Sequence, residues 1–100
     1  MKGALIDKPA AVFTSTGSLH GGQEATLLGM MIPLLHHGML LMGLPYDSDP
    51  NMLDNAPGGT PYGPSHIAGP MADQPLVMEE RKFCMLLGQR MSKILQRLSE

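Results

Sequence analysis

Apolar residues gather in separate stretches of the chain, and their spacing predicts two strands and two helices. Residues 10–14 are small, β-branched or aromatic and run into a turn-rich segment, which predicts a short buried strand. Residues 23–37 are apolar at too many positions for one stripe, so we expect a helix covered on more than one side. Pro33 lies inside this helix and predicts a kink between Gly29 and Pro33.

The next apolar run completes a strand–helix–strand order. Gly38 is a suitable helix end, and residues 39–44 have the length and composition of a strand. This order predicts a right-handed crossover and therefore a parallel pair of strands. Because parallel pairs normally belong to larger α/β sheets, the other edge of strand 10–14 is expected to pair with a further strand or bind a partner.

The second half of the chain has a different pattern of prolines, glycines and apolar residues. Residues 45–75 contain seven prolines and several glycines, which predicts a long loop without a regular element. Residues 76–98 carry apolar side chains at every third or fourth position and predict an amphipathic helix. Glu79 and Glu80 lie near its start and Lys93 and Arg97 near its end, as the helix dipole favours. The predicted order is therefore strand, helix, strand, long loop, helix.

Composition narrows the class of protein. A chain of 100 residues with 43% hydrophobic and 16% charged residues indicates one small α/β domain. Seven basic residues against nine acidic ones give a net charge of −2, which argues against nucleic-acid binding. Cys84 is the single cysteine, which excludes an internal disulfide and fits the cytoplasm. The most apolar stretch is interrupted by Pro33 and Gly38, so we expect no membrane span, and the N-terminal residues do not resemble a secretory signal.

The segment TSTGSLHGGQE, residues 14–24, is the best candidate for chemistry. It lies between the first predicted strand and the helix, at the carboxyl edge of a parallel sheet, where ligands bind. Its glycines let the backbone approach a flat or charged ligand, and its hydroxyls and amides can bond to heteroatoms. On the residues alone, an ordinary strand-to-helix turn capped by Ser or Thr is the favoured interpretation.

Four motifs in this order and spacing, TSTGSLHGGQE, LLHHGM, GLPY and GGTPYGPSHIAGP, resemble the WrbA family. That family is a flavodoxin-like group of FMN-dependent NAD(P)H:quinone oxidoreductases, often tetrameric. The resemblance covers residues 3 to about 98. It implies that the chain is the carboxyl-terminal half of a flavodoxin-like, doubly wound parallel sheet, without the family's phosphate loop. It also implies that residues 58–69 help to build the tetramer and the mouth of the site.

The resemblance further implies which residues contact FMN. The expected cofactor-binding residues are Ser15, Thr16, Gly17, Ser18, Gly21, Gly22 and His36. NAD(P)H would be the co-substrate and a quinone the acceptor, and no side chain is required as acid, base or nucleophile.

The remaining reactive residues have simpler interpretations. His36 and His37 are adjacent on a helix and point about 100° apart, so we expect no metal site there. His20, His37 and His66 are interpreted as capping or solvent-facing residues, and Cys84 as structural.

Two functions follow from the sequence. The first is two-electron reduction of quinones through bound FMN, although a chain without the phosphate contacts should bind FMN weakly. The second is a non-catalytic oligomerisation or interaction module, whose open strand edge and apolar helix dock on another chain.

Overall fold

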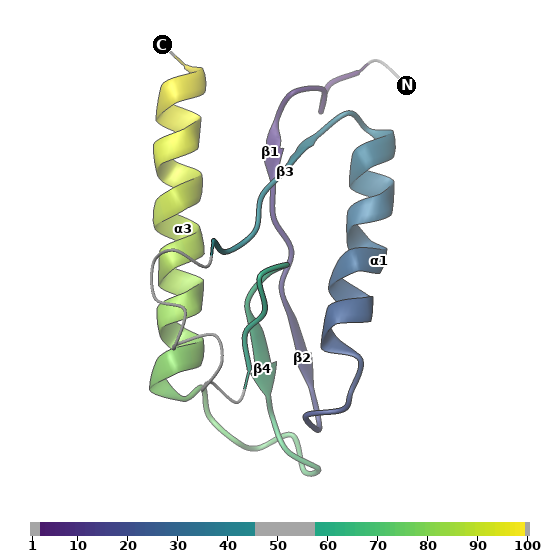
Figure 1. Cartoon of the computed structure of the whole chain (residues 1–100), viewed down its shortest axis with the longest axis vertical. Coiled ribbons are helices and arrows are strands. Elements are labelled where there is room, and N and C mark those ends of the chain that lie inside the picture. Colours follow the sequence, from purple (N-terminus) through teal and green to yellow (C-terminus); the bar gives the residue numbers. More distant parts are fainter. Residues whose placement is uncertain (1–2, 46–57, 100) are drawn as a thin grey trace.

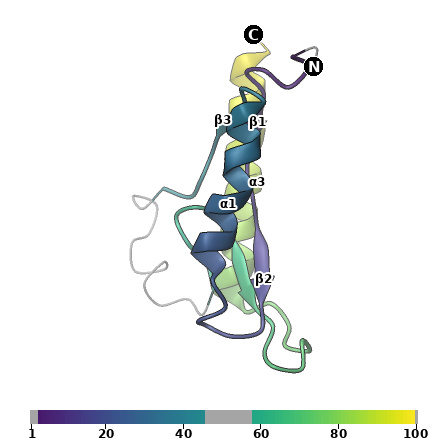
Figure 2. The same cartoon turned by 90° about the vertical axis from the view of Figure 1, so that its right-hand side faces the viewer.

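A computed structural model describes residues 3–45 and 58–99 and shows strands lying between two helices (Figure 1). The view turned by 90° places α1 in front of the strands and α3 behind them (Figure 2). The prediction of an α/β chain is therefore confirmed. The elements in chain order are β1 (Pro9–Ala10), β2 (Thr14–Thr16), α1 (Gln23–His36), β3 (Leu40–Leu41), β4 (Ser65–Ile67) and α3 (Met78–Leu98).

The strands form two parallel pairs. β1 pairs with β3 in the register Pro9↔Leu40, and β2 pairs with β4 in the register Thr14↔Ser65. The first pair is joined by α1, as the strand–helix–strand order predicted. This half-sheet with a helix on each face is consistent with half of a flavodoxin-like fold.

β3 and β4 lie along the same edge of the segment that contains β1 and β2. The N–H of Leu40 donates to the carbonyl of Lys8, and the N–H of Thr14 donates to the carbonyl of Pro64. Because backbone groups of alternate residues in a strand point to opposite edges, bonds from even-numbered residues all face one side. Figure 2 shows β3 and β4 on this common side. The opposite edge has no partner strand among residues 3–45 and 58–99.

The long-loop prediction for residues 45–75 was wrong in one respect, because the segment contains β4. Its three residues are too short to show a period of two, and prolines and glycines surround them. Their strand conformation comes from pairing with β2, far away in the sequence. The part of the predicted loop at residues 46–57 lies outside the described residues.

The regular strands are also shorter than predicted. The predicted strand at residues 10–14 is divided into β1 and β2, which together extend from Pro9 to Thr16. The predicted strand at residues 39–44 is regular only at β3, because the chain turns from β1 toward Pro61 at Leu44, whose N–H donates to the Pro61 carbonyl.

α1 starts at Gln23 and runs without interruption through Pro33 to His36, one residue short of the predicted end. It ends because Gly38 adopts a φ of 76°, which a side chain would disfavour. The N–H of Gly38 then donates to Leu35 and that of Met39 to Leu34, which closes the helix with a Schellman motif. The kink expected before Pro33 stays a prediction.

The described residues cover only one side of α1. Leu27 is fully buried, whereas Leu28, Ile32 and Leu35 are exposed by 43%, 58% and 58%. These three residues are spaced by four and three positions and form one apolar stripe. The cover that we expected on a second side of α1 is therefore not supplied by residues 3–45 and 58–99.

α3 provides most of the core on the other face of the strands. Its Phe83 and Leu87 form a buried cluster with Leu44, against which Ala11 and Leu86 pack. The helix begins at Met78, two residues after the predicted start. Neither α1 nor α3 is both long and apolar enough to cross a membrane.

Candidate functional site

The candidate loop begins within the last two residues of β2 and ends directly before α1. We call residues 15–22 the glycine loop. Apart from Thr16, which is half-buried, all its residues are exposed. The structure therefore brings together, at one end of the strands, every predicted cofactor-binding residue except His36: Ser15, Thr16, Gly17, Ser18, Gly21 and Gly22.

Contacts within the glycine loop fix its shape. The hydroxyl of Thr16 donates to the Ser18 carbonyl at 2.8 Å, and the N–H of Gly21 donates to the same carbonyl at 3.2 Å. A Cβ at Gly21 would lie 2.6 Å from Cβ of Thr16, so only glycine permits this close approach. The Thr16 hydroxyl is thus already bonded, whereas Ser15, Gly17 and Ser18 are exposed.

His36 lies at the opposite end of α1 from the glycine loop (Figure 1). α1 contains 14 residues, which corresponds to a length of about 20 Å at the standard helical rise. The structure therefore does not bring His36 to the loop of its own chain. His36 is exposed at that other end.

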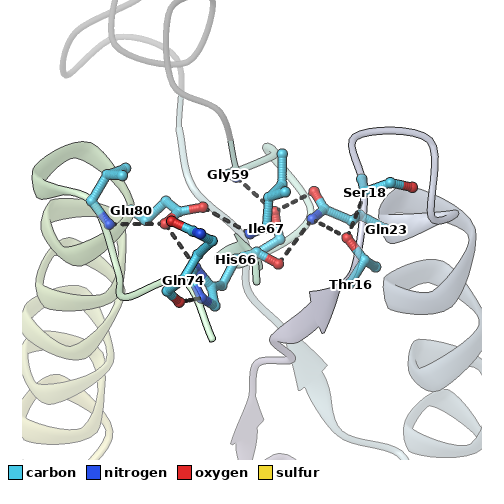
Figure 3. A network of polar contacts seen from close by, with 10 residues as sticks. Thr16, Ser18, Gln23, Gly59, His66, Ile67, Gln74 and Glu80 are labelled. Atoms are coloured by element: carbon cyan, nitrogen blue, oxygen red, sulfur yellow. Dashed lines mark hydrogen bonds and ion pairs between the residues drawn. The ribbon is translucent and has the colours of Figure 1, made fainter. Parts of the chain in front are cut away.

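A polar network lies behind the glycine loop (Figure 3). Gln23, the first residue of α1, donates from Nε2 to the Thr16 hydroxyl at 2.8 Å and to the His66 carbonyl at 3.2 Å. Its Oε1 accepts a bond of 2.7 Å from the hydroxyl of Ser65. The Ser65 hydroxyl in turn accepts from the N–H of Gly59 at 2.6 Å. One carboxamide therefore joins α1, β2 and β4.

The same network continues on the other side of β4 to the start of α3. Glu80 is 1% exposed and accepts bonds from the N–H groups of Ile67 and Val77 at 2.9 and 3.0 Å. Its Oε1 also lies 2.8 Å from Nδ1 of His66. Glu80 thus fixes the first turn of α3 to β4, as a glutamate at the third helical position does in a capping box.

Both nitrogens of the His66 ring face acceptors. Nδ1 faces Glu80, and Nε2 lies 2.8 Å from the Gln74 carbonyl. The bond to Glu80 and the Gln74 carbonyl raise the pKa of His66 above its ordinary value, against the opposing effect of burial. Burial disfavours the charged form of Glu80, but the two N–H groups and His66 together lower its pKa. This geometry favours an imidazolium–carboxylate pair.

Sequence reasoning missed this network. His66 was interpreted as a capping or solvent-facing residue, whereas it bonds to the buried Glu80. Glu80 was recognised only as a helix-start charge, and its spacing of three from Val77 was the one available signal. Gln23 gave no signal, because its partners in β4 lie more than 40 positions away.

Two shallow cavities of about 360 and 460 Å³ lie between the strands and α3. Phe13, Pro64 and Cys84 line both cavities, and Phe13 is 76% exposed. Leu87 and Met91 of α3 extend the apolar lining of the larger one. An apolar hollow beside unpaired strand backbone is a surface on which a further strand can add. Within the described ranges, no cluster of His, Cys, Asp or Glu could hold a metal ion.

Comparison with known proteins shows the family of the chain. No family model matches it. It is 46% identical over 100 residues to an NAD(P)H dehydrogenase (quinone) of Gluconacetobacter diazotrophicus, covering 99% of this chain and 50% of the relative. A protein of the same name from Syntrophobacter fumaroxidans is 40% identical over 99% of this chain and 49% of its own length. The chain belongs to this WrbA-like family.

A third relative with this name, from Solidesulfovibrio magneticus, is 53% identical over 70 residues, which are 69% of this chain and 34% of the relative. The predicted family is therefore confirmed. This WrbA-like chain spans about half the length of the curated relatives it matches. The two-stranded pairs and the open edge agree with that share, because a larger parallel sheet has a strand on each side of its central strands.

Proposed function

We propose that this WrbA-like chain supplies one wall of an FMN site in an NAD(P)H:quinone oxidoreductase. The observation that carries the proposal is the exposed glycine loop at the carboxyl end of β2, held from behind by a complete polar network. The names of the relatives support quinone reduction with NAD(P)H. A loop of glycines and hydroxyls at this edge suits a flat, polar ring system.

Each part of the loop has a separate task in this proposal. Gly21 lets the loop pack closely against Thr16 and Gly17 lies beside the Gly69 carbonyl, while Ser15 and Ser18 offer hydroxyls to the heteroatoms of the ring. Bound FMN would supply the redox chemistry, accepting a hydride from NAD(P)H and passing two electrons to a quinone. The residues of the chain bind, orient and shield, and none of them acts as an acid or base.

We propose that His36 contributes to a site of another copy. It lies about 20 Å from the start of α1, so it is too far to touch a ring held by the glycine loop of its own chain. If the family's flavin-contacting role applies to His36, a homo-oligomer must bring it to a neighbour's loop, which fits the tetramer that the resemblance implies. We place this assembly in the cytoplasm, where NAD(P)H is available.

The test uses the 100-residue chain alone and mixed with the half of the Gluconacetobacter diazotrophicus relative that it does not match, here called the complementary half. The visible spectrum of added FMN reports binding, and oxidation of NADH with benzoquinone reports activity. We expect a perturbed flavin band and quinone-dependent NADH oxidation with both halves present, and very weak FMN binding by the chain alone. A mixture that associates but leaves the flavin spectrum unchanged contradicts the proposal.

A matched pair of variants tests whether the glycine loop forms part of the FMN site. Gly17→Ala adds a methyl 3.4 Å from the Gly69 carbonyl oxygen, an ordinary contact, and Gly29→Ala in α1 meets nothing within 4 Å. Both variants should fold. We expect Gly17→Ala to weaken FMN binding and Gly29→Ala to leave it unchanged, because only the first alters the proposed wall.

The open edge favours a second candidate, a non-catalytic interaction module. Unpaired backbone beside the exposed Phe13 can accept an extended strand of another chain. A stable, colourless complex with the complementary half, without NADH oxidation, would support this function over the enzyme. Phe13→Asp should abolish that complex, because it places a charge in the apolar cavities.

A further inference from the structure

Gln23 is a buried polar residue at the base of the glycine loop. It is 8% exposed, although it begins α1 directly after an exposed loop. A buried carboxamide is costly unless its donors and acceptor are all bonded. Both N–H donations and the Oε1 acceptance of Gln23 are satisfied (Figure 3). Such complete bonding fixes the orientation of the side chain.

The bonds through Gln23 run in one direction only. The N–H of Gly59 donates to Ser65, whose hydroxyl donates to Oε1 of Gln23. Nε2 of Gln23 donates to Thr16, whose hydroxyl donates to the Ser18 carbonyl. Because the series begins at a backbone N–H and ends at a backbone carbonyl, neither hydroxyl can reverse its direction without losing a bond.

The end of this series is the base of the glycine loop. Thr16 is the last residue of β2, and the bond from its hydroxyl to Ser18 turns the chain into the loop. The Thr16 carbonyl is held separately by the N–H of Ala68 at 2.7 Å. The backbone of Thr16 is therefore fixed by β4, while the direction of its hydroxyl, and with it the start of the loop, depends on Gln23.

We propose that Gln23 is a positioning residue that sets the glycine loop for FMN, an inference that rests on the proposed function. Gln23 does not contact the ring. Gln23 acts through Thr16. A substitution of Gln23 should therefore lower FMN affinity more than a substitution elsewhere in the network that lowers stability equally. This distinction separates positioning from a purely structural role.

Two substitutions cut the series on opposite sides of the carboxamide. Gln23→Glu keeps an oxygen for Ser65 but removes the two N–H donors, and even a protonated glutamate restores only one of them. Ser65→Ala removes the bond from the Gly59 N–H and the bond to Oε1 of Gln23. It leaves the donation from Nε2 of Gln23 to Thr16. Both changes break buried hydrogen bonds, so both should lower the melting temperature.

The experiment measures the FMN dissociation constant, by flavin fluorescence, and the melting temperature of each variant mixed with the complementary half. We expect Gln23→Glu to raise the dissociation constant by about tenfold, the value of one lost hydrogen bond, and Ser65→Ala to raise it far less. Amide exchange at Gly17 and Ser18 without FMN should accelerate in Gln23→Glu only. Equal affinity losses that follow the losses in melting temperature overturn the inference.

Failure of the proposed function is distinguishable from failure of this inference. If the unsubstituted mixture binds no FMN, both are overturned. If it binds FMN and Gln23→Glu binds equally well, only the inference is overturned. Should Gln23→Glu not fold, Thr16→Val against Thr16→Ser replaces it, because serine retains the hydroxyl that donates to Ser18. Amide exchange at Gly17 and Ser18 without FMN is then the readout: faster exchange in Thr16→Val that serine reverses supports the inference, and unchanged exchange in Thr16→Val contradicts it.

Discussion

The carboxyl end of β2 and β4 differs from the open edge of the same strands. The two regions differ in how far the described residues bond the polar groups and cover the apolar side chains. At the carboxyl end, Gln23 and Glu80 bond to their neighbours, and no buried side-chain polar atom among residues 3–45 and 58–99 lacks a partner. At the open edge, Phe13 stands 76% exposed beside unfilled apolar cavities. Among the described residues, the buried polar side chains are therefore all bonded, whereas the apolar side chain of Phe13 stays exposed.

This difference has a physical reason. Hydrogen bonds are short and directional, so a few residues from α1, β4 and α3 can satisfy one another locally. A hydrophobic core instead needs cover on both faces and both edges of the strands, and a small chain has little surface to spare. We expect the polar end to hold its geometry in the isolated chain and the open edge to bind the complementary half.

The largest expected effect contrasts a buried phenylalanine of the core with the exposed phenylalanine of the open edge. Phe83 is 1% exposed in the core cluster, so Phe83→Ala should cost about 3–5 kcal/mol and unfold the isolated chain. Phe13→Ala removes a ring that is mostly in water and should change the stability of the isolated chain by less than about 0.5 kcal/mol. Thermal melting followed by circular dichroism compares the two, and equal destabilisation would contradict the assignment of an open edge.

A smaller loss is expected from the buried carboxylate. Glu80→Ala removes the acceptor of His66, Ile67 and Val77 at once and should destabilise the chain by about 3 kcal/mol. Glu80→Gln keeps an acceptor oxygen and should cost less. Urea titration gives both free energies of unfolding, and a Glu80→Ala variant as stable as the parent chain would show that the network does not hold the start of α3.

The charged pair predicts how stability depends on pH. The raised pKa of His66 means that its contribution is complete below its ordinary value of 6.5 and is lost as pH rises through the raised folded-state pKa. The lowered pKa of Glu80 means that its contribution is complete above its ordinary value of 4.5 and is lost as pH falls through the lowered folded-state pKa. The contribution of the pair is therefore greatest between these two ordinary values.

The His66 contribution is tested by melting temperatures measured as pH rises from about 6 to about 9. This range is chosen about the ordinary histidine pKa. The parent chain should lose stability over this range, and His66→Gln should lose less. His20→Gln, a change at an exposed histidine of the glycine loop, serves as the control and should follow the parent. A His66→Gln profile parallel to the parent profile would exclude the proposed ion pair as the cause.

The smallest effect on the isolated chain comes from a charge at the open edge. Phe13→Asp should leave the melting temperature of the isolated chain almost unchanged while preventing association with the complementary half, because a carboxylate cannot enter the apolar cavities. Analytical ultracentrifugation of the mixture measures this association. Undiminished association by Phe13→Asp would place the partner surface elsewhere, for example on the exposed stripe of α1.

The sequence predicted those parts that depend on local patterns. α3 follows from its apolar spacing and α1 from its dense run of apolar residues, and Gly38 marks a helix end because its φ of 76° suits glycine. β4 was missed because pairing with β2 creates it, and no pattern within Ser65–Ile67 reveals that pairing. Gln23, His66 and Glu80 meet only after folding. The resemblance assigned His36 to the flavin without its position, although the helix predicted over residues 23–37 already separates His36 from the glycine loop.

The central claim is that the glycine loop is a wall of an FMN site. Amide hydrogen exchange of the chain with the complementary half, measured with and without FMN, tests it most directly. We predict that FMN slows exchange at residues 17–22 and leaves the middle of α3 unchanged. FMN-dependent protection that appears elsewhere in the chain and spares residues 17–22 would contradict the account.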